Sequence, residues 1–581
     1  SGGAPRVTSQ NVDEIGRAVE AAEAAGRTEV MIDGEPAPIA PIHAELDEFL
    51  AARQGEPKDS LPEGDTTPSP EPVEESRKLG LVIKTNVDGV EYETPRRPRK
   101  PLIECEFPHD HMSANRPKAH QLEGFAWLVE AWRRGWPGVL LADDMGLGKT
   151  YQALAFLSWT RANQAARGRH HPTAPALGPM MVVAPTALLR NWRAEAERHL
   201  TGDGLGEVVE AFGSGLRRLK RPKDADWSAD DSIDLDQLRS AEWILTTYET
   251  LADNHRSFAR VPYSVVVFDE MQKIKEPGSI NTRSAKTLNV DFVIGLTGTP
   301  IENRLEDMWS IFDRLAPGYL GALRDFSRRY GGEDKETLKE LKSRLDTPNE
   351  QLPALMLRRM KHATRDGLPQ KIIKAYKETM PPVQASAYSG VLARAGAGLG
   401  SRKQMLEILH HLRGVSLHPH RADDVDTSDR GSILNWIGES ARLSKCVDLL
   451  RGIAGSGDKA IVFIEDLAAQ RAFAESMAMV FDLEEIPGVL NGGSPGDKRQ
   501  AIVDRFQEAS PGFDLLVLSP RAAGLGLTIT AATHVLHLSR WWNPAVEDQC
   551  KDRAYRIGQI RDVTIHIPLA VHPDMAISRS T

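Results

Sequence analysis

Short apolar runs alternate along this chain with longer stretches in which an apolar residue recurs every three or four positions. Runs of four or five apolar residues are typical of buried parallel strands, and a period near 3.6 residues is typical of helices. Strands that alternate with helices predict parallel sheets covered by helices on both faces. The strand-like runs fall into two series, the first at 139–142, 180–184, 243–247, 265–268 and 292–296, and the second at 460–464, 515–518, 534–538 and 563–567.

The first hundred residues have a different pattern. Residues 12–25 and 42–52 have helical periodicity, with a possible strand at 29–32 between them. Residues 56–77 are rich in Pro, Glu, Ser and Asp, a composition typical of linkers. Residues 81–92 alternate on either side of Asp88-Gly89 and predict a β-hairpin. The expected parts are a small α/β module at 1–55 and a linker with the hairpin at 56–100.

Composition narrows the possible partners. A net charge of −9 over 581 residues argues against a uniformly basic surface for nucleic acid, although a local basic groove remains compatible with it. Cys105, Cys446 and Cys550 lie far apart and lack metal-ligand spacing, so we expect neither a disulfide framework nor a structural metal. No stretch of about 18 apolar residues and no signal peptide occur, which predicts a cytoplasmic protein without a membrane segment.

A candidate phosphate-binding loop follows the first predicted strand. Its sequence, Asp-Asp-Met-Gly-Leu-Gly-Lys-Thr at 143–150, leads into an amphipathic stretch at 151–160. Backbone N–H groups of such a turn, at the start of a helix, bind phosphate. Asp143 stands where the usual pattern has its first glycine, so the stretch alone could also be a strand–helix turn with chance glycines. The residues expected to contact a nucleotide here are Asp144, Met145, Gly146, Leu147, Gly148, Lys149 and Thr150, with Lys149 on the β- and γ-phosphates and Thr150 on Mg²⁺.

An acidic pair, Asp269-Glu270, ends the strand predicted at 265–268. Two carboxylates at a buried strand end are costly unless they meet a cation. Asp269 would hold Mg²⁺, and Glu270 would orient or deprotonate the attacking water. Both strand ends therefore predict the same chemistry, the hydrolysis of a nucleotide.

The stretch 143–150 closely resembles the first motif of the Swi/Snf-type (Snf-two) family of superfamily-two helicase-like ATPases, which has the same departure at the first glycine. Further stretches resemble the family's other motifs in the expected order. The resemblance extends from about Lys118 to Pro568 and implies two tandem RecA-like lobes. Lobe 1 is expected at 101–316, helical protrusions and a linker at 317–435, and lobe 2 at 436–581. The matching stretches are 184–192, 246–248, 269–272, 296–303, 357–361, 368–371, 412–419, 490–499, 519–528, 540–544 and 549–559.

The resemblance also implies roles for residues outside the loop. Gln121, behind the basic Lys118, would clamp the adenine, and Gly524 and Gly526 would allow a close approach of the backbone to ATP. Arg553 and Arg556 lie three residues apart, on one helical face. An arginine delivered to the γ-phosphate accelerates hydrolysis roughly 10³–10⁵-fold. The expected catalytic set is Lys149, Asp269, Glu270, Arg553 and Arg556.

Several matching stretches resemble the family's contacts to the nucleic-acid backbone, which position DNA without reading its sequence. They could alternatively be ordinary loops between strands and helices, and Trp541 could equally be buried between the lobes. The residues expected at nucleic acid are Pro185, Thr186, Arg190, Thr247, Thr299, Asn303, Gly492, Gly493, Arg499, Arg521 and Trp541.

Four histidines, His410, His411, His418 and His420, suggest metal ligands at first sight. No cysteine or carboxylate with matching spacing accompanies them, so we interpret them as packing or surface residues.

By resemblance, the chain is an ATP-dependent translocase on double-stranded DNA that uses Mg²⁺ and remodels DNA–protein complexes. Its partners would be DNA and a displaced or recruiting protein, and it would be associated with the nucleoid. The compact middle segment favours a bacterial source. Alternatives are a strand-separating helicase, a motor for a nuclease or an anti-phage defence system, and, in a different class, a nucleotide-gated DNA-binding scaffold. A scaffold has no need of the whole predicted catalytic set.

Overall fold

The computed structural model describes residues 29–32, 35–38, 85–113, 116–170, 177–220, 233–299, 304–332, 334–349, 351–361, 369–396, 402–492, 496–508, 512–520, 529–541, 544–555 and 559–575. The chain divides into two compact units, Ser1–Gly80 and Leu81–Thr581. In the first unit, β1 (Glu29–Ile32) pairs antiparallel with β2 (Glu35–Pro38), which confirms the strand predicted at 29–32. The helices predicted at 12–25 and 42–52 lie outside the described residues.

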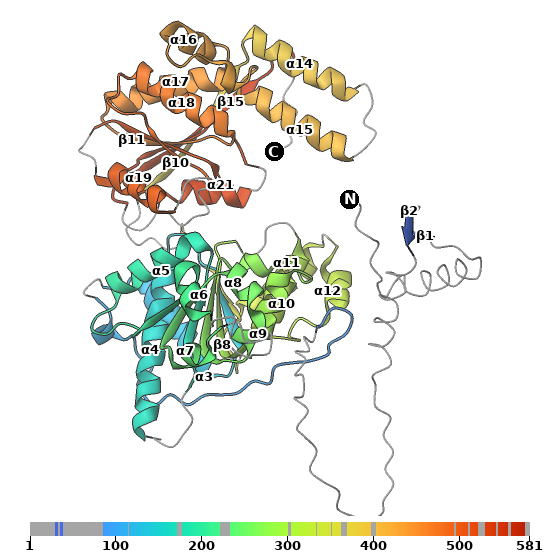
Figure 1. Ribbon diagram of the computed structural model, residues 1–581, viewed down its shortest axis with the longest axis vertical. Helices are drawn as coiled ribbons and strands as arrows, with labels where there is room; N and C mark the ends of the chain where they lie inside the picture. The colour runs from blue at the N-terminus through green and yellow to red at the C-terminus, as the bar shows by residue number, and fades with distance from the viewer. Residues whose placement is uncertain are drawn as a thin grey trace, which may run out of the picture. The chain divides into compact units, whose positions relative to one another are not determined.

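The second unit contains two parallel sheets, each built from one of the two series of apolar runs (Figure 1). The first sheet has the order β5-β6-β4-β7-β8-β3-β9, and every neighbouring pair is parallel. All residues of β3, β4 and β6 are buried, as helices on both faces require. The strands are β3 (Gly138–Leu141), β4 (Met180–Val183), β5 (Val208–Ala211), β6 (Trp243–Thr246), β7 (Pro262–Asp269), β8 (Asn289–Leu296) and β9 (Met356–Leu357).

Helices cover both faces of this sheet. One layer contains α3 (Ala119–Arg133), α4 (Lys149–His170) and α5 (Thr186–His199), which contact one another in that order. The other layer contains α8 (Tyr248–Asp253), α9 (His255–Ala259), α10 (Ile280–Thr287) and α11 (Leu305–Leu315). Further short helices are η1 (His109–His111), α6 (Gly213–Leu219), α7 (Leu235–Ser240) and η2 (Met271–Ile274).

The second sheet has the order β10-β15-β14-β11-β13-β12 and is also parallel throughout. Strand β11 shows how its two faces are filled. Ala460 and Val462 join a core with α17 (Ala441–Gly455) and α18 (Leu467–Val480), whereas Ile461 and Phe463 join a core with α19 (Gly496–Glu508). The strands are β10 (Lys371–Thr379), β11 (Lys459–Phe463), β12 (Gly488–Leu490), β13 (Asp514–Leu518), β14 (His534–His537) and β15 (Val563–Val571), and α21 (Pro544–Lys551) lies between the last two.

Two α/β lobes with parallel sheets confirm the predicted fold class. The middle segment is mostly helical, as predicted, but it also supplies β9 to the first sheet and β10 to the second. These edge strands were not predicted, since β9 is only two residues long and β10 carries four Lys and Glu residues. The helices of this segment are α12 (Leu323–Tyr330), α13 (Lys335–Asp346), α14 (Pro382–Gly396), α15 (Arg402–Leu417), η3 (Ala422–Asp424) and α16 (Arg430–Gly438).

The predicted hairpin around Asp88-Gly89 is wrong for the described part, because no strand forms in 85–100. The side chain of Asn86 takes the place of the strand ladder. Its Oδ1 accepts the backbone N–H groups of Glu91 (2.9 Å) and Tyr92 (3.2 Å), and its Nδ2 donates to Asp313 of α11 (2.8 Å). A polar side chain that satisfies the backbone locally competes with regular pairing.

Among the described residues, no helix combines the length and apolarity needed to cross a membrane.

Candidate active site

Three neighbouring strands bring the predicted chemistry to one edge of the first sheet. β8 lies between β7 and β3, with Leu296 opposite both Asp269 and Leu141. The phosphate loop after β3, the acidic pair at the end of β7 and the turn after β8 therefore start side by side. Ligands of parallel sheets bind at the carboxyl ends of the strands, so this edge is the expected place for a nucleotide.

The loop between β3 and α4 has the backbone of a phosphate-binding turn. Gly146 and Gly148 have φ angles of +83° and +79°, a conformation that side chains other than hydrogen disfavour. The ammonium of Lys149 folds back over the loop and donates to the carbonyl oxygens of Asp143 (2.7 Å) and Asp144 (3.4 Å). The lysine is thus held inside the turn, where incoming phosphate oxygens would compete for it.

Gln121 and its neighbours at the start of α3 pack against this loop. A Cβ on Gly148 would lie 2.4 Å from Nε2 of Gln121, so the amide occupies the space that the glycine leaves. Oε1 of Gln121 accepts the backbone N–H of Lys118 (3.0 Å), and the carbonyl of Leu147 lies 3.0 Å from Nε2 of His120. Gln121 and Lys118, the residues expected near the adenine, therefore lie beside the phosphate loop.

Asp269 is held by two aromatic side chains that the sequence did not single out for this role. Nε1 of Trp192, on α5, donates to its Oδ2 at 2.8 Å, and the Tyr248 hydroxyl donates to its backbone carbonyl at 2.8 Å. Burial, reinforced by the adjacent charge of Glu270, raises the pKa of the Asp269 carboxyl above its usual range. A carboxylate in this state gains from a bound cation.

Glu270 has a left-handed backbone, with φ of 50° and ψ of 53°. Such strain in a residue other than glycine is found mainly at functional sites. Its Oε2 accepts Nε2 of Gln272 (2.6 Å), whose Oε1 accepts the hydroxyl of Thr297 (2.8 Å), and that hydroxyl accepts the backbone N–H of Thr299 (3.0 Å). This chain of hydrogen bonds links the acidic pair to the turn after β8.

Met271 directly follows the acidic pair, and its side chain is fully buried. A Cβ on Gly295 of β8 would lie 2.2 Å from the Met271 sulfur, so the methionine fills the space above this glycine. The methionine is accommodated by a glycine in the neighbouring strand.

These residues fit Mg²⁺ and ATP. The Thr150 hydroxyl and the Asp269 carboxylate are the hard oxygen ligands that Mg²⁺ prefers. Burial and the charge of Glu270 raise the pKa of Asp269, so its ionised form is costly here unless a cation binds. A Cβ on Gly298 would lie 2.8 Å from Met145 and 3.7 Å from the Lys149 ammonium, so the turn after β8 closes one side of the phosphate cradle.

The second lobe contributes an arginine to this loop. Arg553 follows α21, is 4% exposed, and lies with Nη2 3.8 Å from the Met145 sulfur. This contact joins the stretch 549–559 to the phosphate loop at 143–150. The other predicted nucleotide contacts of the second lobe, Gly524, Gly526 and Arg556, lie outside the described residues.

Three of the predicted nucleic-acid residues of the first lobe, Pro185, Thr186 and Thr247, lie at the starts of helices. Pro185 and Thr186 begin α5, and Arg190 on the same helix is exposed. Thr247 is 4% exposed, and its hydroxyl accepts the backbone N–H of Thr250 (2.9 Å), so it caps α8 in this structure. Thr299 follows β8 in the hydrogen-bonded chain from Glu270. A phosphate contact by any of these residues stays a prediction.

In the second lobe, Gly492 is exposed just after β12 and Arg499 lies on α19. The Arg413 guanidinium lies 6.0 Å from the ring centroid of Trp541, a cation–π contact in which a protein cation covers one side of the indole. Asn303, Gly493 and Arg521 lie outside the described residues.

Arg359 is a site residue that sequence reasoning did not assign. Asp143, at the end of β3, is fully buried. Arg359 donates to it from Nε (3.0 Å), from Nη2 (2.5 Å) and from its backbone N–H (3.0 Å). Nη2 also donates to Oε1 of Gln152 on α4 (2.8 Å), and Nη1 donates to the His120 carbonyl. The available signal was Asp143 itself, because a buried aspartate in place of a glycine requires a cation.

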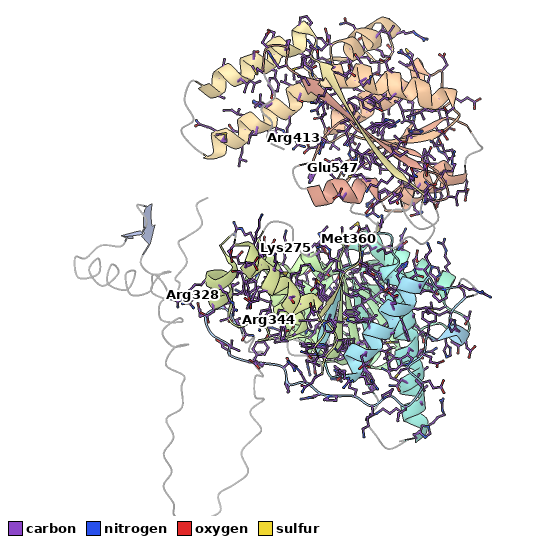
Figure 2. All side chains as sticks on the ribbon, turned by 180° about the vertical axis from the view of Figure 1, so that it is seen from behind. Lys275, Arg328, Arg344, Met360, Arg413 and Glu547 are labelled. Carbon is purple, nitrogen blue, oxygen red and sulfur yellow. The ribbon has the colours of Figure 1, made fainter. Side chains whose placement is uncertain are left out.

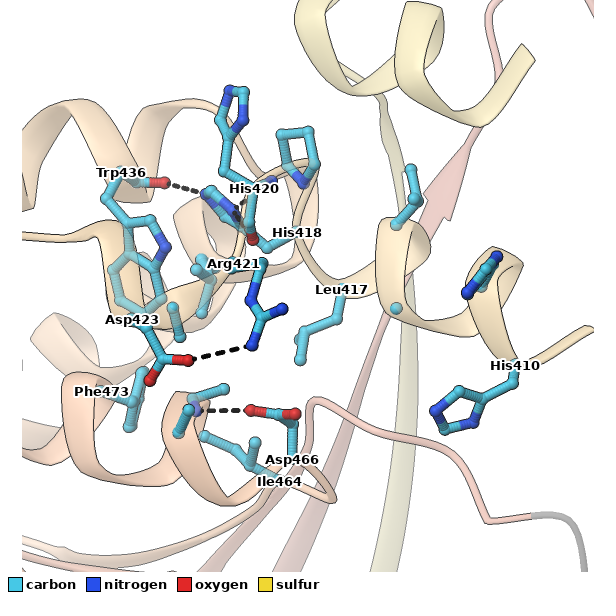
Figure 3. A pocket seen from close by; sticks show the side chains of 18 of the residues that line it. His410, Leu417, His418, His420, Arg421, Asp423, Trp436, Ile464, Asp466 and Phe473 are labelled. Atoms are coloured by element: carbon cyan, nitrogen blue, oxygen red, sulfur yellow. Dashed lines mark hydrogen bonds and ion pairs between the residues drawn. The ribbon is translucent and has the colours of Figure 1, made fainter. Parts of the chain in front are cut away.

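The four histidines that we interpreted as packing or surface residues line a cavity of about 540 Å³ in the second lobe (Figure 3). They are His410, His411, His418 and His420. His418 is a buried packing residue, as predicted, with Nε2 2.8 Å from the Trp436 carbonyl and Nδ1 3.0 Å from the His420 carbonyl. His410 lies on the opposite side of the cavity from Trp436 (Figure 3). Within the described ranges, no group of three or more His, Cys, Asp or Glu could hold a metal ion.

Two family models match this chain, in the order of its two lobes. Residues 120–421, more than half of the chain, match the model of the SNF2-related domain, and 441–558 match the helicase conserved C-terminal domain. Zorya protein ZorD of Escherichia coli is 35% identical over 538 residues, covering 85% of this chain and 46% of that protein. YwqA of Bacillus subtilis, named as a candidate ATP-dependent helicase/translocase, is 30% identical over 457 residues, covering 77% and 46%.

The chain thus spans about half the length of these curated relatives. A solved structure, the Sulfolobus solfataricus SWI2/SNF2 ATPase core in complex with dsDNA, is similar at 27% identity and a TM-score of 0.39, covering 81% of this chain and 90% of that one. With two matching domain models in the order of its two lobes, the chain belongs to the SNF2-related family of ATPases with a helicase C-terminal domain.

Proposed function

We propose that this chain is an ATP-driven motor that moves along double-stranded DNA and remodels or displaces proteins bound to it. Membership of the SNF2-related family supports ATP use, and the likeness to a protein named as a candidate helicase/translocase supports movement on nucleic acid. The observation that carries the proposal is the contact between Arg553, from the helicase C-terminal domain, and Met145 in the phosphate loop. Because residues of both lobes meet at one loop, nucleotide turnover is coupled to the arrangement of the lobes.

Bound Mg²⁺-ATP would supply a γ-phosphoryl group for transfer to water. Lys149 would hold the β- and γ-phosphates, and Thr150 and Asp269 would hold the metal ion. Glu270, oriented by Gln272, would position the attacking water and accept its proton. Arg553, together with Arg556, would stabilise the charge that develops on the phosphoryl oxygens.

Coupling to DNA would pass through the turn after β8. Glu270 is connected to Thr299 through the side chains of Gln272 and Thr297. A phosphate contact that moves this turn would therefore reorient the carboxylate that positions the water. Because backbone contacts carry no sequence information, the motor would act on DNA of any sequence, with an affinity that falls steeply with salt.

A strand-separating helicase is the first alternative, and a motor serving a nuclease or an anti-phage defence system is the second. Both would use the same nucleotide site, and they differ in what happens to the DNA. A nucleotide-gated scaffold, the third alternative, would bind DNA without turnover. A location at the nucleoid follows from duplex DNA as the substrate.

The deciding experiment measures steady-state ATP hydrolysis at one fixed salt concentration with no nucleic acid, duplex DNA, single-stranded DNA or RNA. Lys149→Ala serves as the inactive control. Strong stimulation by duplex DNA, together with displacement of a third strand from a triplex without separation of the duplex, would support translocation. Separation of the duplex would establish the helicase instead. A rate that no nucleic acid changes would contradict the motor and favour the scaffold.

A further inference from the structure

The segment that leaves the first lobe is fixed along the phosphate loop. β9 pairs in parallel with β3, and the hydrogen bonds continue beyond both strands. The backbone N–H of Ala142 donates to the Leu357 carbonyl (2.7 Å), and that of Asp144 donates to the Arg359 carbonyl (3.0 Å). The backbone N–H of Lys361 donates to Oδ2 of Asp144 (2.9 Å). Residues 357–361 and 142–144 therefore form one rigid body.

Arg359 adds to the contact between these two segments, because its guanidinium and backbone N–H both bind the buried carboxylate of Asp143. Met360, the next residue, is 37% exposed and marks the point where the chain leaves the first lobe (Figure 2). Lys361, the residue after it, is 9% exposed.

The Lys361 ammonium contacts the second lobe. It lies 2.7 Å from Oδ1 of Asp552 and donates to the carbonyl of Tyr555 at 2.8 Å. It also lies 5.0 Å from the centroid of the Tyr555 ring, and Lys371 lies 3.6 Å from the same Asp552 oxygen. In sequence, Asp552 directly precedes Arg553 and Tyr555 directly precedes Arg556. One lysine therefore holds the turn on which Arg553 lies.

We propose that Lys361 is a positioning residue for hydrolysis, which ties the phosphate loop to the turn of Arg553 through its ion pair with Asp552. This inference rests on the proposed function, since it assumes that Arg553 acts on the nucleotide. The path is short, from Asp144 to the Lys361 backbone, then through its side chain to Asp552 and Tyr555. Loss of the ion pair should leave the phosphate loop intact but release Arg553.

The charges around Lys361 agree with this role. Its side chain and that of Asp552 are 8% and 12% exposed, so their attraction is screened less by solvent than that of a surface pair. Burial lowers the pKa of Lys361 to about 8, the Asp552 and Asp144 charges oppose that shift, and Lys371 adds to it. Tyr555, packed against the ammonium, has its own pKa raised by burial. The ion pair is therefore formed at neutral pH and is lost as the pH rises through about 8.

The test compares Lys361→Met with Lys361→Arg, Asp552→Asn and the double variant K361M/D552N in the full chain. The readouts are kcat for ATP hydrolysis, affinity for a slowly hydrolysed ATP analogue, affinity for ADP with aluminium fluoride, and the melting temperature. A misplacement of about 1 Å can reduce turnover about 100-fold. We expect Lys361→Met to lose about that factor in kcat and in its preference for the transition-state analogue, while ATP-analogue binding stays unchanged. The melting temperature should fall in Lys361→Met and less in the double variant, because only the single variant leaves the Asp552 carboxylate buried without the Lys361 ammonium.

Lys361→Arg should recover part of the loss, and the double variant should be no worse than Lys361→Met. Lys339→Met is the matched control, because Lys339 also lies 2.7 Å from a carboxylate, that of Glu336, but both side chains are at least 70% exposed. A pH profile adds a second readout, since wild-type kcat should fall above pH about 8 and that of Lys361→Arg should not.

Unchanged turnover in Lys361→Met, or additive losses in the double variant, would overturn the proposal. Weakened ATP-analogue binding in step with kcat would also overturn it, since Lys361 would then support the phosphate loop itself. If Lys361→Met does not fold, Asp552→Asn and Lys361→Arg carry the same comparison. Failure of the proposed motor looks different. The wild-type rate would then not change with any nucleic acid, whereas the effect of Lys361 on the preference for the transition-state analogue would still be measurable.

Discussion

Two acidic strand ends in the first lobe differ in how their charge is balanced. Asp143, at the end of β3, is fully buried and receives three hydrogen bonds from Arg359. Asp269, at the end of β7, receives N–H groups from Trp192 and from the backbone of Glu270. No ion pair of Asp269 occurs among the described residues, and a second carboxylate follows it directly.

The comparison indicates that Asp143 stabilises the fold, whereas Asp269 is suited to binding a ligand. Asp143 meets a cation of its own chain from 216 residues away, so its charge fixes the segment after β9 to the phosphate loop. Asp269 is left with a raised pKa and a neighbouring negative charge, which favours an external cation such as Mg²⁺. Two similar positions in one sheet thus have opposite uses, and mutations at them should have opposite effects on stability and turnover.

The largest effect is expected on ATP hydrolysis, in the proposed nucleotide site to which Asp269 belongs. Lys149→Ala should reduce ATP hydrolysis about 10³-fold, because it removes the cation that we propose to face the phosphates. The far-ultraviolet circular dichroism spectrum should stay unchanged, since the carbonyls of Asp143 and Asp144, to which Lys149 donates, belong to a loop and not to a helix or strand. Turnover close to that of the wild type would disprove the assignment of the phosphate site.

The second largest effect is expected on stability, at the buried pair of Arg359 and Asp143. Arg359→Met should lower the free energy of unfolding by about 3–5 kcal/mol, because it leaves the Asp143 carboxylate buried without its partner. Chemical denaturation measures this change. Asp143→Asn in the same chain should restore part of it, since the remaining group is then neutral.

Arg193→Met is a matched control for Arg359→Met. Arg193 also forms an ion pair, at 2.8 Å from Glu210, but its side chain is 52% exposed. Exposed pairs contribute about 1 kcal/mol or less. Equal losses in the two variants would remove the distinction between a buried structural pair and a surface one.

A smaller effect on stability is expected at Gly295 of β8, the strand between β7 and β3. Gly295→Ala should lower the free energy of unfolding by about 1–3 kcal/mol, because the added methyl would meet the Met271 sulfur at 2.2 Å. Met271→Ala alone should also destabilise the chain, since it leaves a cavity. The double variant G295A/M271A should be more stable than the sum of the two losses predicts. Additive losses would show that Met271 does not depend on this glycine.

Much of the fold could be predicted from the sequence because parallel strands buried on both faces are continuous apolar runs. The runs at 139–142, 265–268 and 515–518 all became strands at the expected places. β9 and β10 were not predicted, because edge strands need only one neighbour and can be short or charged. The hairpin around Asp88 failed because alternation cannot reveal that an asparagine side chain will bind the backbone instead.

The candidate site shows the same limit. Motif residues such as Lys149 and Asp269 could be named from their neighbours in sequence, and the fold brings them to one sheet edge. Trp192, Arg359 and Lys361 act on those residues from 77, 216 and 217 positions away. Contacts over such distances depend on the order of strands in the sheet, which periodicity does not give.

The smallest and most specific effect is expected at Asp269 in the absence of nucleotide. A carboxyl whose folded pKa lies above its unfolded value near 4 binds more protons in the folded state. Its contribution to stability is therefore present at low pH and is lost as the pH rises through the folded pKa. Asp269→Asn removes that loss and should stabilise the chain at about pH 7.5. The gain should disappear below about pH 3, where the wild-type carboxyl is protonated in both states.

Adding Mg²⁺ and an ATP analogue should reverse the order at neutral pH. The wild type should then become the more stable protein, because a ligand that binds only the folded state stabilises it, and Asp269→Asn has lost a metal ligand. Thermal melting of both proteins, with and without the ligands, tests both halves of the comparison. An Asp269→Asn variant that is less stable without ligand would place Asp269 with Asp143, as a structural carboxylate rather than a metal ligand.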